Sequence, residues 1–251
     1  MIKVVLLGAG NVGTHLFRAL HKAENISLIQ WYNRSAQSLE EGKGKVKTLS
    51  QLDELVPEAD LYLLSISDDN ISELSSKLKS CKGIIAHTAG SVGMEALNPC
   101  KDHGVFYPLQ TFSKQKKVDF EQVPLCLEAN TKENFTLLKQ VAIALGGPIH
   151  RIDSTQRKAL HIAAVFVNNF VNHLYAVGEQ LCLEHQVPFS VLQPLIAETA
   201  DKIKSLSPKA AQTGPALRED QQVLKDHLSL LTKTTQKELY QLISTAIQQD
   251  G

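Results

Sequence analysis

The pattern of apolar and polar residues changes at Ser154. Before it, short apolar runs alternate with amphipathic segments, beginning with Ile2–Leu7 and then Thr14–Ala23. After it, apolar residues recur at helical spacing to the end of the chain. Strands that alternate with helices are typical of a parallel sheet. The sequence therefore predicts an α/β domain at residues 1–152 and an all-α domain at residues 153–251.

Within the first domain, the apolar runs and their bounding polar residues define the expected elements. Pro108 cannot donate to a sheet, which places the end of its run at an edge or in a loop. The predicted strands after the first are 26–32, 60–66, 83–87, 105–113, 125–128 and 149–152, and the helical patterns are 49–55, 71–78 and 132–145.

The second domain opens with a long helix, which Ser154 can cap and which runs to about His185. Its middle, Leu160–Val177, is apolar on most sides, as in a helix buried in a small helical domain or between two subunits. Further helices are predicted at 191–206, at 217–231, and from Thr234 or Thr235 to Gln249.

The motif Gly8-Ala9-Gly10-Asn11-Val12-Gly13 joins the first strand to the first helix. Gly8 permits a sharp turn, Gly10 lets a pyrophosphate approach the backbone, and Gly13 lets the helix pack closely on the strand. The first N–H groups of the helix favour phosphate. We interpret residues 8–13, including Asn11 and Val12, as a dinucleotide site of Rossmann type rather than as a merely structural turn.

The second strand ends in Asn33-Arg34-Ser35, where NAD sites usually carry an acidic residue that binds the ribose 2′-OH. Arg34 can pair with a 2′-phosphate, and Asn33 and Ser35 can donate hydrogen bonds to it. The segment predicts NADP as the cofactor; the alternative is a solvated arginine in a turn.

Ligands of such sheets bind beyond the carboxyl ends of the strands. That rule adds two segments to the expected cofactor site, one after each of two central strands. Their residues could instead cap helices or pack in the core. The segments comprise Ser65, Ile66 and Ser67, and Thr88, Ala89 and Gly90.

Polar residues interrupt the apolar long helix. At about 100° per residue, His161, Asn168 and Asn172 share one side, and Asn169 lies next to it. Buried polar groups need partners, so these side chains either bond within the protein or face a ligand. Further along, Asp220 and His227 share a helix face, where the acid could orient the imidazole or form a surface ion pair.

Composition excludes several classes of function. The 26 basic and 26 acidic residues leave no positive excess for nucleic acid. The four cysteines have no metal-ligand spacing and indicate a reducing compartment. No signal peptide and no uninterrupted apolar run of membrane-spanning length is found, so we expect a cytoplasmic protein that binds neither membrane nor metal.

These motifs, with His87–Ser91, Pro108–Phe112 and Thr213-Gly214-Pro215 beside Arg218 and Asp220, resemble oxidoreductases that join a Rossmann-like domain to a DUF2520 domain. More distantly they resemble F420-dependent NADP oxidoreductases, pyrroline-5-carboxylate reductases, ketopantoate reductases and β-hydroxyacid dehydrogenases. The resemblance implies an NADP-binding domain and a homodimer formed through the C-terminal helices. β-Hydroxyacid dehydrogenases carry a Lys followed by Asn on the long helix, where this chain has His161, Asn168 and Asn169.

Two functions of different classes follow. The first is an oxidoreductase that transfers hydride between NADP(H) and a small keto, imine or hydroxy compound. In it His161 would donate the proton, because imidazole titrates near neutral pH, and Asn169 or Asn168 would hold the substrate. The second is a non-catalytic NADP(H)-binding module that reports the redox state of the cofactor. An F420-dependent NADP reductase is a further alternative.

Overall fold

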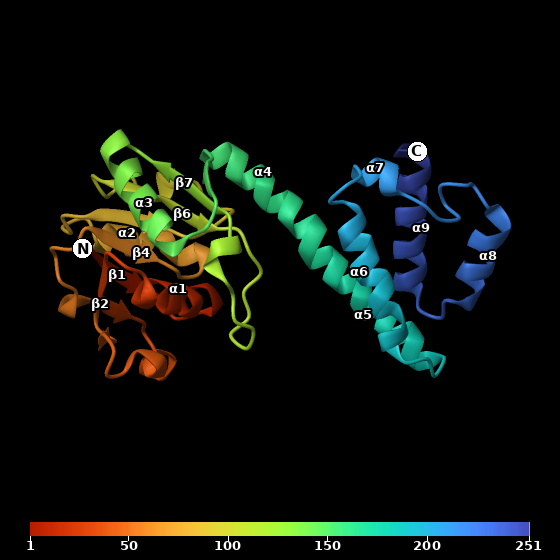
Figure 1. The fold of residues 1–251 in the computed structure, drawn as a ribbon, viewed down its shortest axis with the longest axis horizontal. Helices are drawn as coiled ribbons and strands as arrows, with labels where there is room; N and C mark the ends of the chain where they lie inside the picture. The colour runs from red at the N-terminus through yellow and green to blue at the C-terminus, as the bar shows by residue number, and fades with distance from the viewer. Residues whose placement is uncertain (251) are drawn as a thin grey trace. The chain divides into compact units, whose positions relative to one another are not determined.

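The computed structural model describes residues 1–250, and Asp250 only through its backbone. The residue contacts divide the chain into two compact units, Met1–Asn168 and Asn169–Gly251. Figure 1 shows the sheet in the first unit and helices alone in the second. The prediction of a mostly parallel Rossmann-like sheet followed by an all-α region is confirmed.

The sheet has eight strands in the order β3-β2-β1-β4-β5-β6-β7-β8. All neighbouring strands are parallel except β6 and β7. Their bounds are β1 Ile2–Leu7, β2 Ile26–Tyr32, β3 Lys47–Leu49, β4 Leu61–Leu64, β5 Ile84–His87, β6 His103–Pro108, β7 Leu125–Ala129 and β8 Ile149–Arg151.

Alternate strand residues face two separate cores, because side chains alternate along a strand. Val4 and Leu6 pack with α1 (Asn11–Lys22) and α3 (Lys132–Leu145) on one face. Val5 and Leu7 pack on the other face with α2 (Ile71–Lys77). The sheet is therefore covered on both faces. A ligand can reach it at the carboxyl ends of the parallel strands.

One expectation about the sheet is wrong, and another is met by one of its two alternatives. The segment 49–55 is not a helix: β3 pairs with β2, and a 3-10 turn at Leu52–Glu54 follows. The strand β6 ends at Pro108, which stands opposite Leu125, and residues 109–113 lie outside the strands, as the loop alternative for this run predicted. A proline at the last residue of a strand removes only one terminal hydrogen bond, which the sheet tolerates.

The long helix runs over Ser154–Glu184, but Asp153 rather than Ser154 caps it. The Asp153 carboxylate accepts from Gln156 N–H at 2.8 Å, and the Gln156 side chain accepts from Asp153 N–H at 3.0 Å. This capping box fixes where the helix begins. The helix consists of α4 (Ser154–Ala164), a π-helical turn (Val165–Phe170) and α5 (Val171–Glu184).

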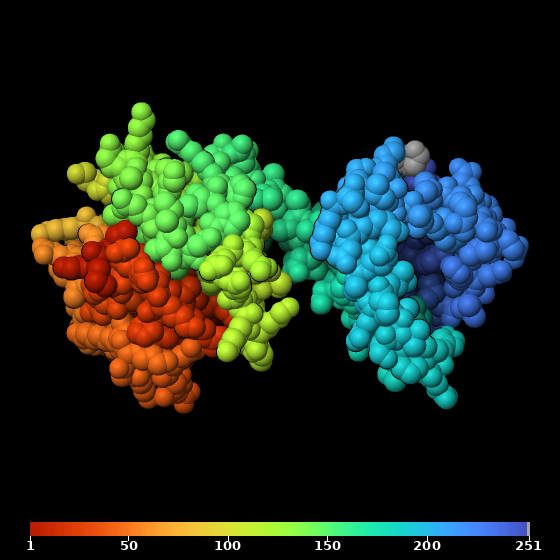
Figure 2. All heavy atoms as spheres, viewed as in Figure 1, coloured from red at the N-terminus to blue at the C-terminus, as the bar shows by residue number. Residues whose placement is uncertain are grey.

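In the second unit, further helices follow α5. They are α6 Gln193–Lys202, α7 Pro208–Ala211, α8 Gln221–Leu230 and α9 Thr234–Asp250. In Figure 2 the surface of α9, the darkest blue segment, is set back between the segments on either side of it. A cavity of about 340 Å³ in this unit is lined mainly by apolar residues of α5 and α9.

Candidate nucleotide and active site

In the turn between β1 and α1, each of the three glycines has the conformation or the space that its place in the motif predicts. Gly8 has φ +108°, and a Cβ there would lie 2.0 Å from the Ser65 carbonyl oxygen. A Cβ on Gly13 would lie 2.3 Å from the Gly8 oxygen, so α1 packs against the turn. At Gly10 a Cβ would meet no atom within 4 Å. The turn is thus tight at its ends and open in the middle, as a pyrophosphate requires.

Residues in and directly after β2 stabilise this turn. The buried Trp31 indole donates to the Gly8 carbonyl at 2.9 Å and stacks on Phe17 of α1 at 4.1 Å. Asn33 Oδ1 accepts from Ala9 N–H at 3.2 Å, while its Nδ2 donates to the Ser35 carbonyl at 3.1 Å. Asn33 therefore holds the backbone of the turn, and Arg34 is left as the cationic side chain there. The tryptophan's role was not predicted from the sequence.

A cavity of about 530 Å³ opens over the turn and the neighbouring strand ends. Gly13 and Ser35 do not line it. Most of the other predicted cofactor residues do: Gly8, Gly10, Asn11, Val12, Asn33, Arg34, Ser65, Ile66, Ser67, Thr88, Ala89 and Gly90.

The strand order orients this cavity. Arg34 follows β2, the glycine turn follows β1, Ser65–Ser67 follow β4, and Thr88–Gly90 follow β5. Since these strands are adjacent in the order β2-β1-β4-β5, the cavity crosses four strand ends in succession. An extended dinucleotide laid along it would have its 2′ position near Arg34 and its nicotinamide near Thr88–Gly90.

His161 of α4 also lines this cavity, on the Gly90 side. Its Nδ1 lies 3.2 Å from the hydroxyl of Tyr107, a buried residue of β6. A Cβ on Gly90 would be 2.6 Å from His161 Nδ1 and 2.8 Å from Tyr107 Cζ. Gly90 thus gives the imidazole room beside the phenol, and Nε2 is the ring nitrogen left for a ligand. Burial raises the pKa of Tyr107, so the phenol keeps its proton at neutral pH.

Asn168 and Asn169 are not among the residues of this arrangement. Both belong to the π-helical turn, are exposed and do not line the cavity, and Asn169 begins the second compact unit. A π turn has wider hydrogen-bonded rings than an α-helix. The common polar face calculated at 100° per residue therefore does not continue unchanged from His161 through Asn168 to Asn172.

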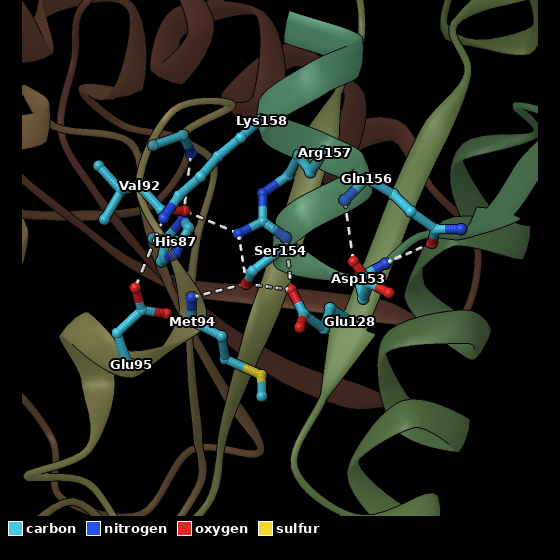
Figure 3. A network of polar contacts seen from close by, with 11 residues as sticks. His87, Val92, Met94, Glu95, Glu128, Asp153, Ser154, Gln156, Arg157 and Lys158 are labelled. Carbon is cyan, nitrogen blue, oxygen red and sulfur yellow. Dashed lines mark hydrogen bonds and ion pairs between the residues drawn. The ribbon is translucent and has the colours of Figure 1, made fainter.

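A buried polar network fixes the start of α4 (Figure 3). The Arg157 guanidinium, 1% exposed, pairs with Glu128 of β7 and donates to the Val92 carbonyl at 2.7 Å and to Ser154 Oγ at 3.0 Å. Ser154 Oγ in turn donates to Glu128 at 2.7 Å and accepts from Met94 N–H at 2.9 Å. Arg157 stands one turn before His161, so this network determines where the imidazole lies.

His87 borders this network rather than the cavity. Its imidazole is fully buried, and Nδ1 accepts from Ala89 N–H at 3.2 Å. Burial, and secondly the positive charge of Arg157, lower the pKa of His87 to about 4. His87 is therefore neutral at physiological pH, and its hydrogen bond with Ala89 N–H stabilises the Thr88–Gly90 backbone.

In the helical unit, the expected pairing of Asp220 with His227 is wrong. Asp220 caps α8 by accepting from Val223 N–H at 3.3 Å. His227 Nδ1 instead lies 2.8 Å from the Tyr240 hydroxyl of α9. Among the residues that the structure describes, no cluster of metal-binding side chains is found.

The geometry fits a dinucleotide. The first α1 hydrogen bond runs from Thr14 N–H to the Gly10 carbonyl at 2.9 Å, which leaves the N–H groups of Asn11, Val12 and Gly13 free for phosphate oxygens. The absent Cβ of Gly10 leaves space above them. Fold and cavity together define a Rossmann-like protein with a helical C-terminal domain.

Comparison with known proteins identifies the family. Residues 1–112 match a Rossmann-like domain, and residues 123–247 match a domain of unknown function, DUF2520. A Bacteroides fragilis protein, provisionally described as an NADP oxidoreductase, is 40% identical over 99% of this chain and 98% of its own, with a TM-score of 0.91. The chain belongs to this Rossmann-like and DUF2520 family.

More distant structures share the fold. A Thermotoga maritima protein is 22% identical over 98% of this chain and 97% of its own, with a TM-score of 0.73. The 1-pyrroline-5-carboxylate reductase of Streptococcus pyogenes is 13% identical over 99% and 98% of the two chains, with a TM-score of 0.63. No curated protein sequence matches the chain.

Proposed function

We propose that the protein is an oxidoreductase that transfers hydride between NADP(H) and a small keto, imine or hydroxy compound. One observation carries the proposal: a single cavity runs from Arg34 over the glycine turn to His161. A cofactor site thereby ends at a side chain suited to proton transfer. The B. fragilis relative, with its provisional description as an NADP oxidoreductase, supports the same class.

In this proposal, residues of the chain bind the cofactor and exchange a proton with the substrate. NADP(H), when bound, supplies or accepts the hydride. Arg34 binds the 2′-phosphate, and the amides of the glycine turn bind the pyrophosphate. His161 exchanges a proton with the substrate atom through Nε2, because Nδ1 contacts Tyr107. Asn168 and Asn169 do not line the cavity, so either would hold the substrate only where the long helix brings it to the same ligand.

The first test is titration of the purified protein with NADPH and NADH, followed through Trp31 and through NADPH fluorescence. We expect NADPH to bind at least about tenfold more tightly, because only its 2′-phosphate forms a charge-assisted pair with Arg34. Ketones and imines are then screened for NADPH consumption. His161→Gln should retain NADPH binding and lose turnover on any substrate found. Equal affinities for the two nucleotides would contradict the proposed cofactor.

A non-catalytic NADP(H)-binding module is the second candidate, and one observation favours it. Asn168 and Asn169, two of the three candidate catalytic residues, do not line the cavity. NADPH binding without turnover of any ketone or imine would support this module. Turnover only after addition of F420 would support an F420-dependent NADP reductase.

We also propose that the protein is a cytoplasmic homodimer, joined through the long helix. Apolar residues of this helix are each at least 60% exposed in the single chain: Ile162, Val167 and Leu183. By length and composition, the Ser154–Glu184 helix, with a mean hydropathy of 1.2, is also long and apolar enough to cross a membrane, and its most apolar window is not buried within the single chain. His161, Asn168, Asn169 and Asn172 would be costly in lipid, which favours a second copy as the cover.

Sedimentation velocity tests the dimer. We expect twice the chain mass of 27.6 kDa, and a shift toward the single-chain mass in Val167→Asp, because the substitution places a charge in an apolar interface. Ile143→Asp is the control: Ile143 lies on α3, is 60% exposed against 74% for Val167, and its variant should remain dimeric. A wild-type protein that sediments as a monomer would refute this arrangement.

A further inference from the structure

One flank of α2 forms a wall of the nucleotide cavity. Asn70, at the N-cap of α2, and Glu73, Leu74 and Lys77 within it all line the cavity, as does Arg34 from the end of β2. Residues three and four apart share a helix face. The 2′ end of the cavity is therefore bounded by two elements, although the usual sequence rule considers only the end of β2.

This wall brings an acidic residue and a second cation to the cavity. Lys77 Nζ lies 2.6 Å from Glu73 Oε1. The hydrogen bond from Lys77 and, more weakly, the charge of Arg34 lower the pKa of Glu73, so the carboxylate interacts with both cations. Both side chains of the Glu73–Lys77 pair are more than half exposed and are free to change partners.

We propose that Glu73 and Lys77 set the cofactor preference at this end of the cavity, an inference that rests on the proposed function. Lys77 leaves Glu73 and joins Arg34 on the 2′-phosphate, whose charge near −2 exceeds that of a carboxylate. Glu73 repels that phosphate and accepts a hydrogen bond from the 2′-OH of NADH. The site thus contains the acidic residue that the end of β2 lacks. Its preference for NADPH depends on the balance between two cations that attract the 2′-phosphate and one carboxylate that repels it, so NADH can also bind.

The experiment measures the dissociation constants of NADPH and NADH for the full chain and two variants. Glu73→Gln should tighten NADPH about fivefold and weaken NADH about twofold, because it removes a like charge from the phosphate and a charged acceptor from the hydroxyl. Lys77→Met should weaken NADPH about tenfold and leave NADH within about twofold. The NADPH effects should shrink as NaCl is raised, since both groups are exposed.

Fragments of the cofactor localise the effect. Adenosine 2′,5′-bisphosphate should reproduce the changes seen for NADPH. Adenosine 5′-monophosphate, which keeps the 2′-OH, should respond to both substitutions as NADH does. Glu40→Gln is the matched control: Glu40 pairs with Lys43 on the surface, does not line the cavity and carries the same charge. It should alter neither dissociation constant.

The outcomes separate this inference from the proposed function. A wild-type protein that binds neither nucleotide would refute the proposed function itself. A wild-type protein that prefers NADPH, with Glu73→Gln and Lys77→Met both unchanged in their NADPH to NADH ratio, would refute only the role of α2. A loss of binding of both nucleotides in one variant, with an unchanged unfolding midpoint, would also contradict a role confined to the 2′ position.

Discussion

Replacing Glu128 with alanine is expected to lower the free energy of unfolding of the sheet unit by about 3–5 kcal/mol. The Arg157 guanidinium that it pairs with is 1% exposed, so water cannot solvate the charge that the substitution leaves unpaired. Ser154 would also lose the acceptor of its hydroxyl, at 2.7 Å in the native protein. Urea unfolding followed by circular dichroism and by Trp31 fluorescence measures the change.

Two matched variants separate charge from packing. Glu128→Gln keeps an acceptor for Arg157 but removes its charge, so its cost should be intermediate. Glu128→Leu combined with Arg157→Met removes both charges and should recover most of the stability, because buried ion pairs can often be replaced by apolar residues of similar size. A loss below about 1 kcal/mol in Glu128→Ala would mean that the pair is effectively solvated.

The network also connects stability with the candidate active site. Arg157 and His161 are four residues apart on α4, so a helix released from β7 would no longer hold the imidazole beside Tyr107 and Gly90. Glu128→Gln should therefore retain NADPH binding at the glycine turn while it alters proton transfer at His161. This difference makes Glu128 a positioning residue rather than one that contacts the ligand.

Where strong local signals bound an element, the sequence predicted it to the residue. The helix Lys132–Leu145 begins after Thr131, whose side chain accepts from Asn134 N–H, and ends at Gly146 with φ +87°. By contrast, the short pattern at 49–55 is compatible with either a helix or a strand. Of its residues, only Leu49 pairs with β2, and a 3-10 turn at Leu52–Glu54 follows. Neither glycine nor proline marks the π turn at Val165–Phe170, so helical periodicity could not reveal it.

Some residues of the candidate site could be predicted from the sequence, and others are revealed only by tertiary structure. Residues at the ends of parallel strands were predictable, because the carboxyl ends meet at one edge of the sheet. Tyr107 looked like a core strand residue, and only the packing of α4 over Gly90 reveals its contact with His161. Glu73 and Lys77 were not predicted either, since the placement of α2 beside Arg34 depends on tertiary structure. The capping box was the one missed signal present in the sequence, as Gln156 follows Asp153 by three residues.

Gly8→Ala should abolish measurable NADPH binding and destabilise the fold by about 3 kcal/mol or more. The added Cβ would lie 2.0 Å from the Ser65 oxygen and 2.6 Å from its carbonyl carbon, both backbone atoms at the end of β4. Alanine is also strained at φ +108°. The turn would have to move away from β4, and the amides that face the pyrophosphate would move with it.

Two other glycines make this result interpretable. Gly44 has φ +73° but a Cβ there would meet nothing within 4 Å, so Gly44→Ala should show strain alone, about 1–2 kcal/mol, with NADPH binding intact. Gly10 is equally open but faces the cavity at a normal φ of −71°, so Gly10→Ala should fold normally and bind NADPH at least about tenfold more weakly. If Gly10→Ala bound NADPH as the wild type does, the pyrophosphate would not lie over this turn, and the cavity would have to accept the nucleotide in another orientation.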